Sequence, residues 1–205
     1  MNINQIKDDS KLYKPIFNNR IDHLKFCANA VSVEGSICEF GVWKGETLKV
    51  LSNLFPEKTI YGFDSFAGLP ETWYRSFDRN RRSEAYEFAL PHVPLFDENV
   101  SLEVGWFEST IPNWMNGTDD SLSLIHIDSD LYSSAKTILN SLNNKIVSGT
   151  VIVFDELCDW QDQGVYERWQ EGEAKAFVEW VKSYNRSVEP LSRTEWIEGS
   201  FIVKG

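Results

Sequence analysis

Short apolar runs rich in β-branched residues alternate along this sequence with stretches of helical periodicity, and this alternation is what most constrains the fold. The runs lie at residues 36–40, 59–63, 101–104, 122–127, 150–154 and 199–203. Helical periodicity is found at residues 21–31, 46–55, 133–142 and 177–184. Such alternation is typical of a mostly parallel sheet with helices on both faces. We therefore expect an α/β protein with one domain over residues 1–205.

Size and charge narrow the class of protein further. The chain of 205 residues is long enough for one α/β core. Its net charge of -11 would repel a nucleic-acid backbone, so we expect no nucleic-acid partner. No apolar run reaches the ~20 residues of a membrane-spanning helix, and the first ten residues lack the apolar centre of a secretory signal. We expect a cytoplasmic protein with no membrane partner and three reduced cysteines.

Three of the predicted strands end at a carboxylate. These residues are Asp64, Asp128 and Asp155. In open α/β sheets, ligands bind outside the carboxyl ends of the strands, so the three side chains would face one crevice. Each of them, taken alone, is equally compatible with a capping role in the loop that follows the strand.

The first strand-to-helix turn contains Gly41, Trp43 and Gly45. A dinucleotide site requires a middle glycine where Trp43 stands, because the backbone must approach the pyrophosphate there. The turn therefore favours a nucleoside-type ligand without a pyrophosphate, with Gly41 and Gly45 on the cofactor side. Asp64, at the end of the next strand, is placed to accept hydrogen bonds from both ribose hydroxyls.

Acidic residues after the fourth and fifth predicted strands indicate a metal site. Asp128 and Asp155 are separated by one strand–helix–strand crossover, so adjacent strands would present them about 5 Å apart. With Glu156 beside them, the carboxylates would repel one another unless a cation neutralised them. Oxygen ligands favour Mg²⁺ or Mn²⁺ over Zn²⁺. The alternative is a solvated acidic rim that binds nothing, and His126 is interpreted as a hydrogen-bonded core histidine.

Residues 71–99 show no sustained periodicity and are expected to form a lid over the crevice. Trp73 and Tyr74 would stack on a sugar, unless they only pack in the core. The basic run with Arg79, Arg81 and Arg82 would bind a phosphate if the acceptor is nucleotide-linked, and is otherwise a solvated face.

Four segments carry a resemblance to a known family. They are EFGVWKG at 39–45, YGFDSFAGLP at 61–70, GWFESTIP at 105–112 and HIDSDLY at 126–132. Together they resemble the macrocin O-methyltransferase family, whose members are class I, S-adenosylmethionine-dependent and magnesium-dependent enzymes that methylate sugar hydroxyls. The resemblance runs from about residue 36 to residue 156. It implies a single Rossmann-like methyltransferase domain with a mostly parallel seven-stranded sheet.

The resemblance also implies roles for individual residues. Glu39 and Gly41 would hold the methionine moiety of the cofactor, and Asp64 its ribose. Phe107 and Glu108 would lie on the adenine side. The metal ligands would be Asp128, Asp155 and Glu156. The family commonly has aspartate where this chain has Glu156, which would alter the geometry at the metal.

From these residues we expect transfer of the S-adenosylmethionine methyl group to a sugar hydroxyl of a small glycoside or activated sugar. A metal would chelate two neighbouring oxygens of a vicinal diol and lower the pKa of one hydroxyl. The proton would go to Asp128 or, because a metal-bound carboxylate is a weak base, to solvent. One alternative is a methyltransferase of the same fold that acts on a phenolic diol. Another is a nucleoside-binding module without turnover. The partner is a small sugar-containing acceptor, and the sequence is compatible with a homodimer.

Overall fold

A computed structural model describes residues 1–205. The strands are β1 (Ile16–Phe17), β2 (Ser36–Phe40), β3 (Ile60–Asp64), β4 (Trp73–Tyr74), β5 (Arg82–Ser83), β6 (Val100–Val104), β7 (Leu122–Ile127), β8 (Ile146–Phe154), β9 (Val188–Thr194) and β10 (Gly199–Val203). The helices are α1 (Ile3–Asp8), α2 (Arg20–Asn29), α3 (Glu46–Leu54), α4 (Phe107–Asn116), α5 (Tyr132–Leu142) and α6 (Glu173–Ser183), with a 3-10 turn at Trp169–Glu171. None of these helices is long and apolar enough to cross a membrane.

The main sheet has the strand order β1-β9-β10-β8-β7-β2-β3-β6. Strands β8, β7, β2, β3 and β6 are mutually parallel, whereas β10 runs antiparallel to both β8 and β9. The expected seven strands are therefore present, and the two-residue strand β1 extends the sheet to eight by pairing with β9. The α/β class is confirmed, and the strand number is corrected by one.

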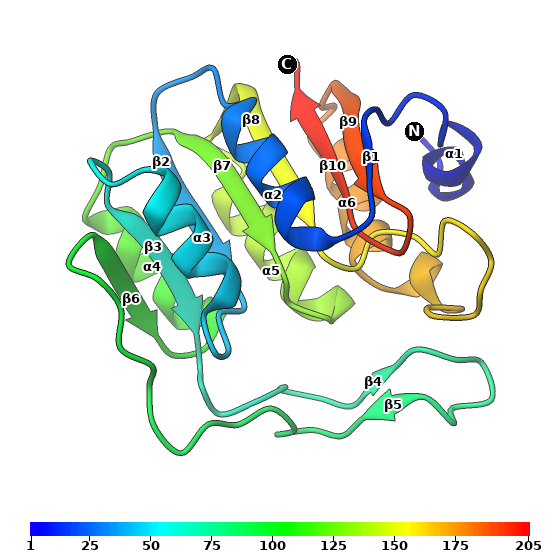
Figure 1. The fold of residues 1–205 in the computed structure, drawn as a ribbon, viewed down its shortest axis with the longest axis horizontal. Coiled ribbons are helices and arrows are strands. Elements are labelled where there is room, and N and C mark those ends of the chain that lie inside the picture. The colour runs from blue at the N-terminus through cyan, green and yellow to red at the C-terminus, as the bar shows by residue number, and fades with distance from the viewer.

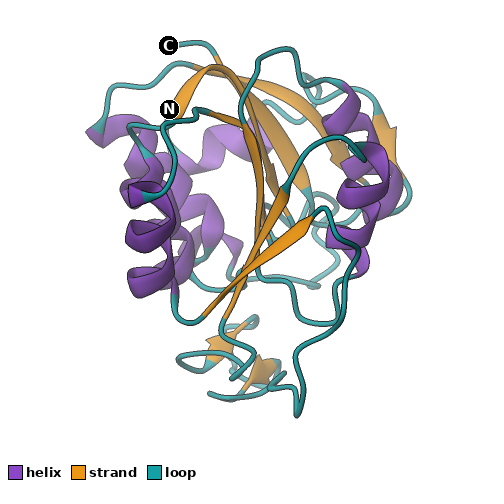
Figure 2. Cartoon of the chain, turned by 90° about the vertical axis from the view of Figure 1, so that its left-hand side faces the viewer, coloured by secondary structure: helices purple, strands orange, loops and turns teal.

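Helices cover both faces of this sheet (Figures 1 and 2). Helices α2 and α3 lie on one face, and α4, α5 and α6 pack in sequence on the other (Figure 1). Every residue of the central strands β2 and β7 is buried, as expected for parallel strands covered on both sides. This arrangement brings the carboxyl ends of β2, β3, β7 and β8 to one edge of the molecule.

Local sequence explains which elements were predicted and which were missed. Residues 36–40, 122–127 and 199–203 form strands with the predicted bounds. Helix α4 was missed because Pro112 and the polar residues around it obscure its periodicity. Strand β9 was missed because it carries Pro190 and charged side chains near the edge of the sheet.

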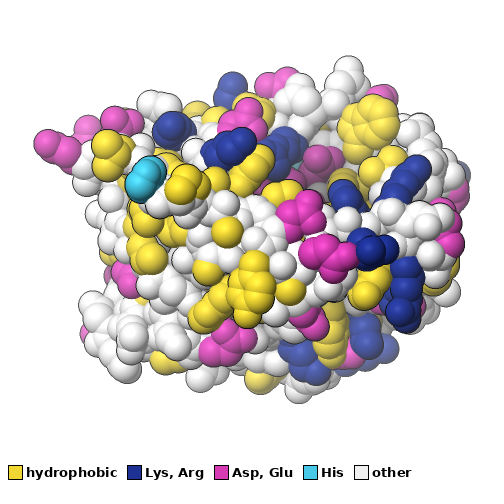
Figure 3. Space-filling view, turned by 90° about the horizontal axis from the view of Figure 1, so that it is seen from below, with side chains coloured by type: hydrophobic (Ala, Val, Ile, Leu, Met, Phe, Trp, Pro, Cys, Tyr) yellow, Lys and Arg dark blue, Asp and Glu magenta, His cyan; other side chains and the backbone are white.

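Residues 71–99 run beneath the carboxyl ends of the strands (Figure 1). They are not free of regular structure, because β4 and β5 pair as a short antiparallel ladder. Viewed from this side, charged side chains are interspersed with exposed hydrophobic ones (Figure 3). Phe77, Tyr86 and Leu95 are among the exposed apolar residues of the segment. That residues 71–99 act as a lid stays a prediction.

The roles expected for the aromatic and basic residues of this segment need correction. Trp73 is buried and its ring packs against the ring of Tyr166 at 5.7 Å between centroids, so it is not free to stack on a sugar. Arg82 pairs with Glu84, and Arg81 donates to the carbonyl of Gly164. The guanidinium of Arg79 lies over Tyr74. These arginines satisfy local partners and do not line the main cavity.

Candidate active site

A cavity of about 680 Å³ opens at the carboxyl ends of β2, β3, β6, β7 and β8. Its wall is built from the turns that follow these strands, together with the first turns of α2, α3 and α4. Eight of the nine candidate site residues line it: Gly41, Gly45, Asp64, Phe107, Glu108, Asp128, Asp155 and Glu156. The structure therefore brings eight of the nine residues together around one cavity, and Glu39 is the exception.

The turn between β2 and α3 requires glycine at two positions. Gly41 has φ +94°, and a Cβ there would lie 1.7 Å from the carbonyl oxygen of Asp128. Gly45 has φ +77°, and a Cβ there would lie about 2.2 Å from the ring of Phe96. Only glycine fits such contacts at positive φ. The turn is thus packed tightly against both the loop after β7 and the segment that lies below the sheet.

Asp64 organises this turn through its carboxylate. Its Oδ2 accepts hydrogen bonds from the backbone N–H groups of Val42 at 2.8 Å and Trp43 at 2.7 Å. Its Oδ1 accepts one from the N–H of Phe66 at 2.7 Å. A carboxylate has about four lone-pair sites, so about one is left for a ligand. Asp64 lines the cavity as expected, but it has less free hydrogen-bonding capacity than two ribose hydroxyls need.

Trp43 stands at the cavity mouth with its backbone at φ +46°. Its ring is 42% exposed and meets the ring of Phe88, from the segment below the sheet, edge-on at 5.9 Å. The backbone donors that a pyrophosphate would need are bonded to Asp64 instead. The turn therefore fits a nucleoside-type ligand better than a dinucleotide.

Another part of the cavity wall is formed by the start of α4. Trp106 precedes the first residue of this helix, and Phe107 and Glu108 form its first turn on the cavity side. Phe107 packs edge-on against Phe40 at 5.7 Å. An aromatic ring and a carboxylate at this wall offer the two kinds of contact that a purine takes, stacking and hydrogen bonding.

Glu39 lies beneath the cavity and not in its wall. It is fully buried, and its two carboxylate oxygens bind Thr47 Oγ1 at 3.0 Å and His126 Nδ1 at 2.9 Å. His126 Nε2 in turn lies 3.8 Å from Asp155 Oδ1. The interpretation of His126 as a hydrogen-bonded core histidine agrees with this position. These contacts connect β2, which carries Glu39, to Asp155 at the end of β8.

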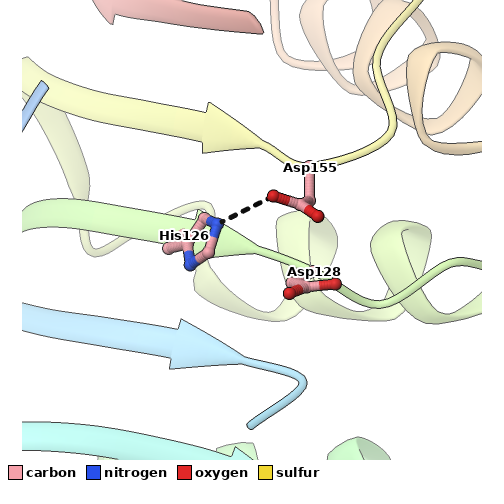
Figure 4. Close-up of side chains that lie close together, drawn as sticks. All are labelled: His126, Asp128 and Asp155. Carbon is pink, nitrogen blue, oxygen red and sulfur yellow. Dashed lines mark ion pairs between the residues drawn. The ribbon is translucent and has the colours of Figure 1, made fainter. Parts of the chain in front are cut away.

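Carboxylates cluster at the ends of the adjacent strands β7 and β8, where Asp128 and Asp155 lie side by side (Figure 4). Potential ligand atoms of His126, Asp128 and Asp155 lie within 4.8 Å of one another, and so do those of Asp128, Asp130 and Glu156. Asp128 belongs to both groups, whereas Asp155 and Glu156 fall in different ones. Asp128, Asp155 and Glu156 all line the cavity, but neither group contains all three, and Asp130 joins Asp128 and Glu156 in the second group.

Burial and mutual repulsion set the protonation of this cluster. Burial, followed by the charge of Asp155, raises the pKa values of Asp128 and Glu156 well above their usual range. Burial and Asp155 likewise raise the pKa of Asp130 to about 7. Burial disfavours the charged form of Asp155 too, but His126 and Arg20 outweigh it and lower its pKa. Asp155 is thus the best neutralised carboxylate of the cluster.

The residues missed by sequence reasoning come from elements that precede or follow the predicted motifs. Arg20, the first residue of α2, places its guanidinium 3.0 Å from Asp155 Oδ2 and 3.4 Å from Asp128 Oδ2. Glu173, the first residue of α6, accepts bonds from the N–H and hydroxyl of Ser129, both at 3.0 Å. The short motif patterns contain no signal for either contact, because both are made across the fold.

A search against protein-family models matches residues 9–175 to the macrocin-O-methyltransferase (TylF) family. Among curated proteins, the chain is 25% identical over 158 residues to demethyldecarbamoylnovobiocin O-methyltransferase of Streptomyces niveus, covering 67% of this chain and 59% of the relative. It is 21% identical over 162 residues to mycinamicin III 3''-O-methyltransferase of Micromonospora griseorubida, covering 68% and 63%. The chain thus spans about three fifths of the length of these relatives.

Solved structures share the fold. One is the apo structure of CalS11, a TDP-rhamnose 3'-O-methyltransferase, with a TM-score of 0.58, 22% identity and coverage of 82% of this chain and 73% of that one. Another is the MycE methyltransferase in complex with Mg and SAH, with a TM-score of 0.54, 11% identity and coverage of 89% and 48%. The family match covers most of the chain and all four motif segments. The chain belongs to the macrocin-O-methyltransferase (TylF) family.

Proposed function

We propose that this protein is an S-adenosylmethionine-dependent O-methyltransferase that acts on a sugar hydroxyl. The observation that carries the proposal is the shared cavity, in which the glycine turn with Asp64 and the carboxylate cluster of β7 and β8 face the same space. Family membership supports the reaction class. The names of the relatives, one of which is a TDP-rhamnose 3'-O-methyltransferase, support a sugar-containing acceptor.

The part of the cavity formed by the glycine turn, Asp64 and the start of α4, here called the donor half, would hold S-adenosylmethionine. This cofactor supplies the methyl group from its sulfonium sulfur. Gly41 and Gly45 shape the turn, and Asp64 would accept a hydrogen bond from the ribose. Phe107 and Glu108 would contact the adenine. Glu39 is buried, so it would not contact the methionine moiety itself. It would act there only through the backbone and through Thr47, whose side chain it holds in position.

The part of the cavity that is lined by Asp128, Asp155 and Glu156 fits a divalent cation with oxygen ligands. Glu156 Oε2 is buried without any hydrogen-bond partner, which is the state expected of an atom that awaits a cation. We propose Asp128, Asp155 and Glu156 as the ligands and Mg²⁺ or Mn²⁺ as the ion. The Mg-bound structure of MycE supports this choice. Such a cation, if bound there, would supply Lewis-acid chemistry that lowers the pKa of an acceptor hydroxyl.

Residues of this chain would then handle the proton and the approach of the acceptor. As the acceptor oxygen forms its bond to the methyl carbon, the carbon–sulfur bond breaks and the hydroxyl proton goes to a carboxylate. Asp128 is our first candidate for that carboxylate. Asp130 is the second, because it lines the cavity and its carboxylate lies within 4.8 Å of that of Asp128. The segment 71–99 would exclude water from the reacting groups.

The test is methyl transfer from labelled S-adenosylmethionine to a panel of glycosides and phenolic diols, with product detection by mass spectrometry. We expect a methylated glycoside with Mg²⁺, loss of product in excess EDTA, and loss of product in Asp155→Asn. Asp119→Asn removes an exposed carboxylate elsewhere and should retain activity. Methylation of phenolic diols alone would reject the sugar acceptor, and cofactor binding without turnover on any acceptor would favour a binding module.

A further inference from the structure

Arg20 is a basic side chain inserted into the most acidic part of the molecule. Its Nη1 lies 3.0 Å from Asp155 Oδ2 and 3.4 Å from Asp128 Oδ2, and its Nη2 lies 2.9 Å from Glu46 Oε2. The residue begins α2, whereas the three carboxylates come from the loops after β7 and β8 and from the start of α3. One guanidinium thus joins the acid cluster to the start of the helix that follows the glycine turn.

The helix does not explain this position of Arg20. The first turn of a helix favours negative charge, so a cation there is unfavourable. The start of α2 is already capped by Asn19, whose side chain accepts a hydrogen bond from the N–H of Asp22. Arg20 therefore gains its stabilisation from the carboxylates across the cavity and not from its own helix.

Two basic side chains meet the carboxylates of Asp128 and Asp155, and only one of them has room to move. His126 is buried and is hydrogen-bonded to Glu39 on its other side. The Arg20 side chain is 34% exposed, lines the open cavity and has a flexible stem. It also keeps a second partner, Glu46, that lies outside the proposed ligand set. Arg20 can therefore move away from Asp128 and Asp155 and still pair its charge with Glu46.

We propose that Arg20 is the exchangeable counter-cation of the metal site. In the metal-free protein its guanidinium neutralises Asp128 and Asp155, and binding of a divalent cation requires it to release their Oδ2 atoms while it stays paired with Glu46. The inference rests on the proposed metal function. It assigns Arg20 the role of a competitor that sets the metal affinity, because a bound cation must displace it from Asp128 and Asp155.

The experiment is titration of the purified protein with Mn²⁺, with free Mn²⁺ followed by electron paramagnetic resonance. Arg20→Gln removes the competing charge, and we expect Mn²⁺ to bind at least about tenfold more tightly than to the wild type. Lys25→Gln, which removes an exposed charge from the same helix, should leave the affinity unchanged. The melting temperature of metal-free Arg20→Gln should fall, and saturating Mn²⁺ should restore it to near the wild-type value.

A structural role for Arg20 would give a different result. If the guanidinium only holds Asp155 in place for the metal, Arg20→Gln would bind Mn²⁺ more weakly than the wild type, and this or an unchanged affinity would overturn the exchange. Arg20→Lys keeps a positive charge but lacks the planar guanidinium that bridges two carboxylates, so it should bind Mn²⁺ with an affinity between those of the wild type and Arg20→Gln. If Arg20→Gln aggregates, the comparison of Arg20→Lys with the wild type tests the same exchange. Absence of Mn²⁺ binding in wild type and variants alike would overturn both the exchange and the proposed metal function.

Discussion

Replacement of Asp64 by alanine tests the donor half of the cavity. Three of about four lone-pair sites on the carboxylate accept backbone N–H groups in the structure, which leaves about one for a ribose hydroxyl. A hydrogen bond to a charged acceptor contributes about 1.5–3 kcal/mol. Asp64→Ala should therefore weaken cofactor binding by roughly 10- to 150-fold. The variant also leaves the N–H groups of Val42 and Trp43 without their acceptor, so the affinity should fall toward the larger figure.

Isothermal titration calorimetry with S-adenosylhomocysteine measures this loss without turnover. Asp64→Asn should bind with intermediate affinity, because its amide has one oxygen in place of two and its NH₂ group faces backbone donors. Asp119→Ala, at an exposed carboxylate without partners, should bind like the wild type. Wild-type affinity in folded Asp64→Ala would refute the placement of the cofactor ribose at the glycine turn.

Other predictions concern the acid cluster and the segment below it. Asp128→Asn should abolish turnover while calorimetry still detects S-adenosylhomocysteine binding. Glu156→Asp should retain more metal-dependent activity than Glu156→Ala, since only aspartate keeps an oxygen ligand. Burial raises the pKa of Glu173 to about 8 from 4.5, so the folded protein holds a proton that the unfolded chain has released. The free energy of unfolding of the metal-free protein should thus fall as pH rises between about 4.5 and 8, and Glu173→Gln should flatten this dependence in denaturant titrations. Proteolysis within residues 71–99 should slow when cofactor, Mg²⁺ and acceptor are all present, and unchanged cleavage would argue against closure.

The parts of the site that are local in sequence were predictable. Gly41 and Asp128 directly follow β2 and β7, Asp64 is the last residue of β3, and the carboxyl ends of parallel strands converge at one edge of the sheet. The sequence therefore specified which turns form the cavity wall. It also favoured a nucleoside-type ligand without a pyrophosphate, because Trp43 stands where a dinucleotide turn has its middle glycine.

The parts that depend on the meeting of distant elements were not predictable. Glu39 was expected in the cavity, but the side chains of Thr47 and His126 bind it beneath the cavity floor. Trp73 was expected to be available to a sugar, but Tyr166 packs against it. Arg20 precedes the first motif by almost twenty residues, and no pattern in one sequence connects it to Asp155. Hydrogen bonding and burial across the fold decide these positions.

The most direct test of the account is a crystal structure of the protein soaked with MnCl₂ and S-adenosylhomocysteine, with the manganese located by anomalous diffraction. We predict one peak in contact with carboxylate oxygens of Asp128, Asp155 and Glu156, the ribose of the cofactor beside Asp64, and the Arg20 guanidinium withdrawn to Glu46. A cofactor bound elsewhere, or a map without a manganese peak in the acid cluster, would contradict it.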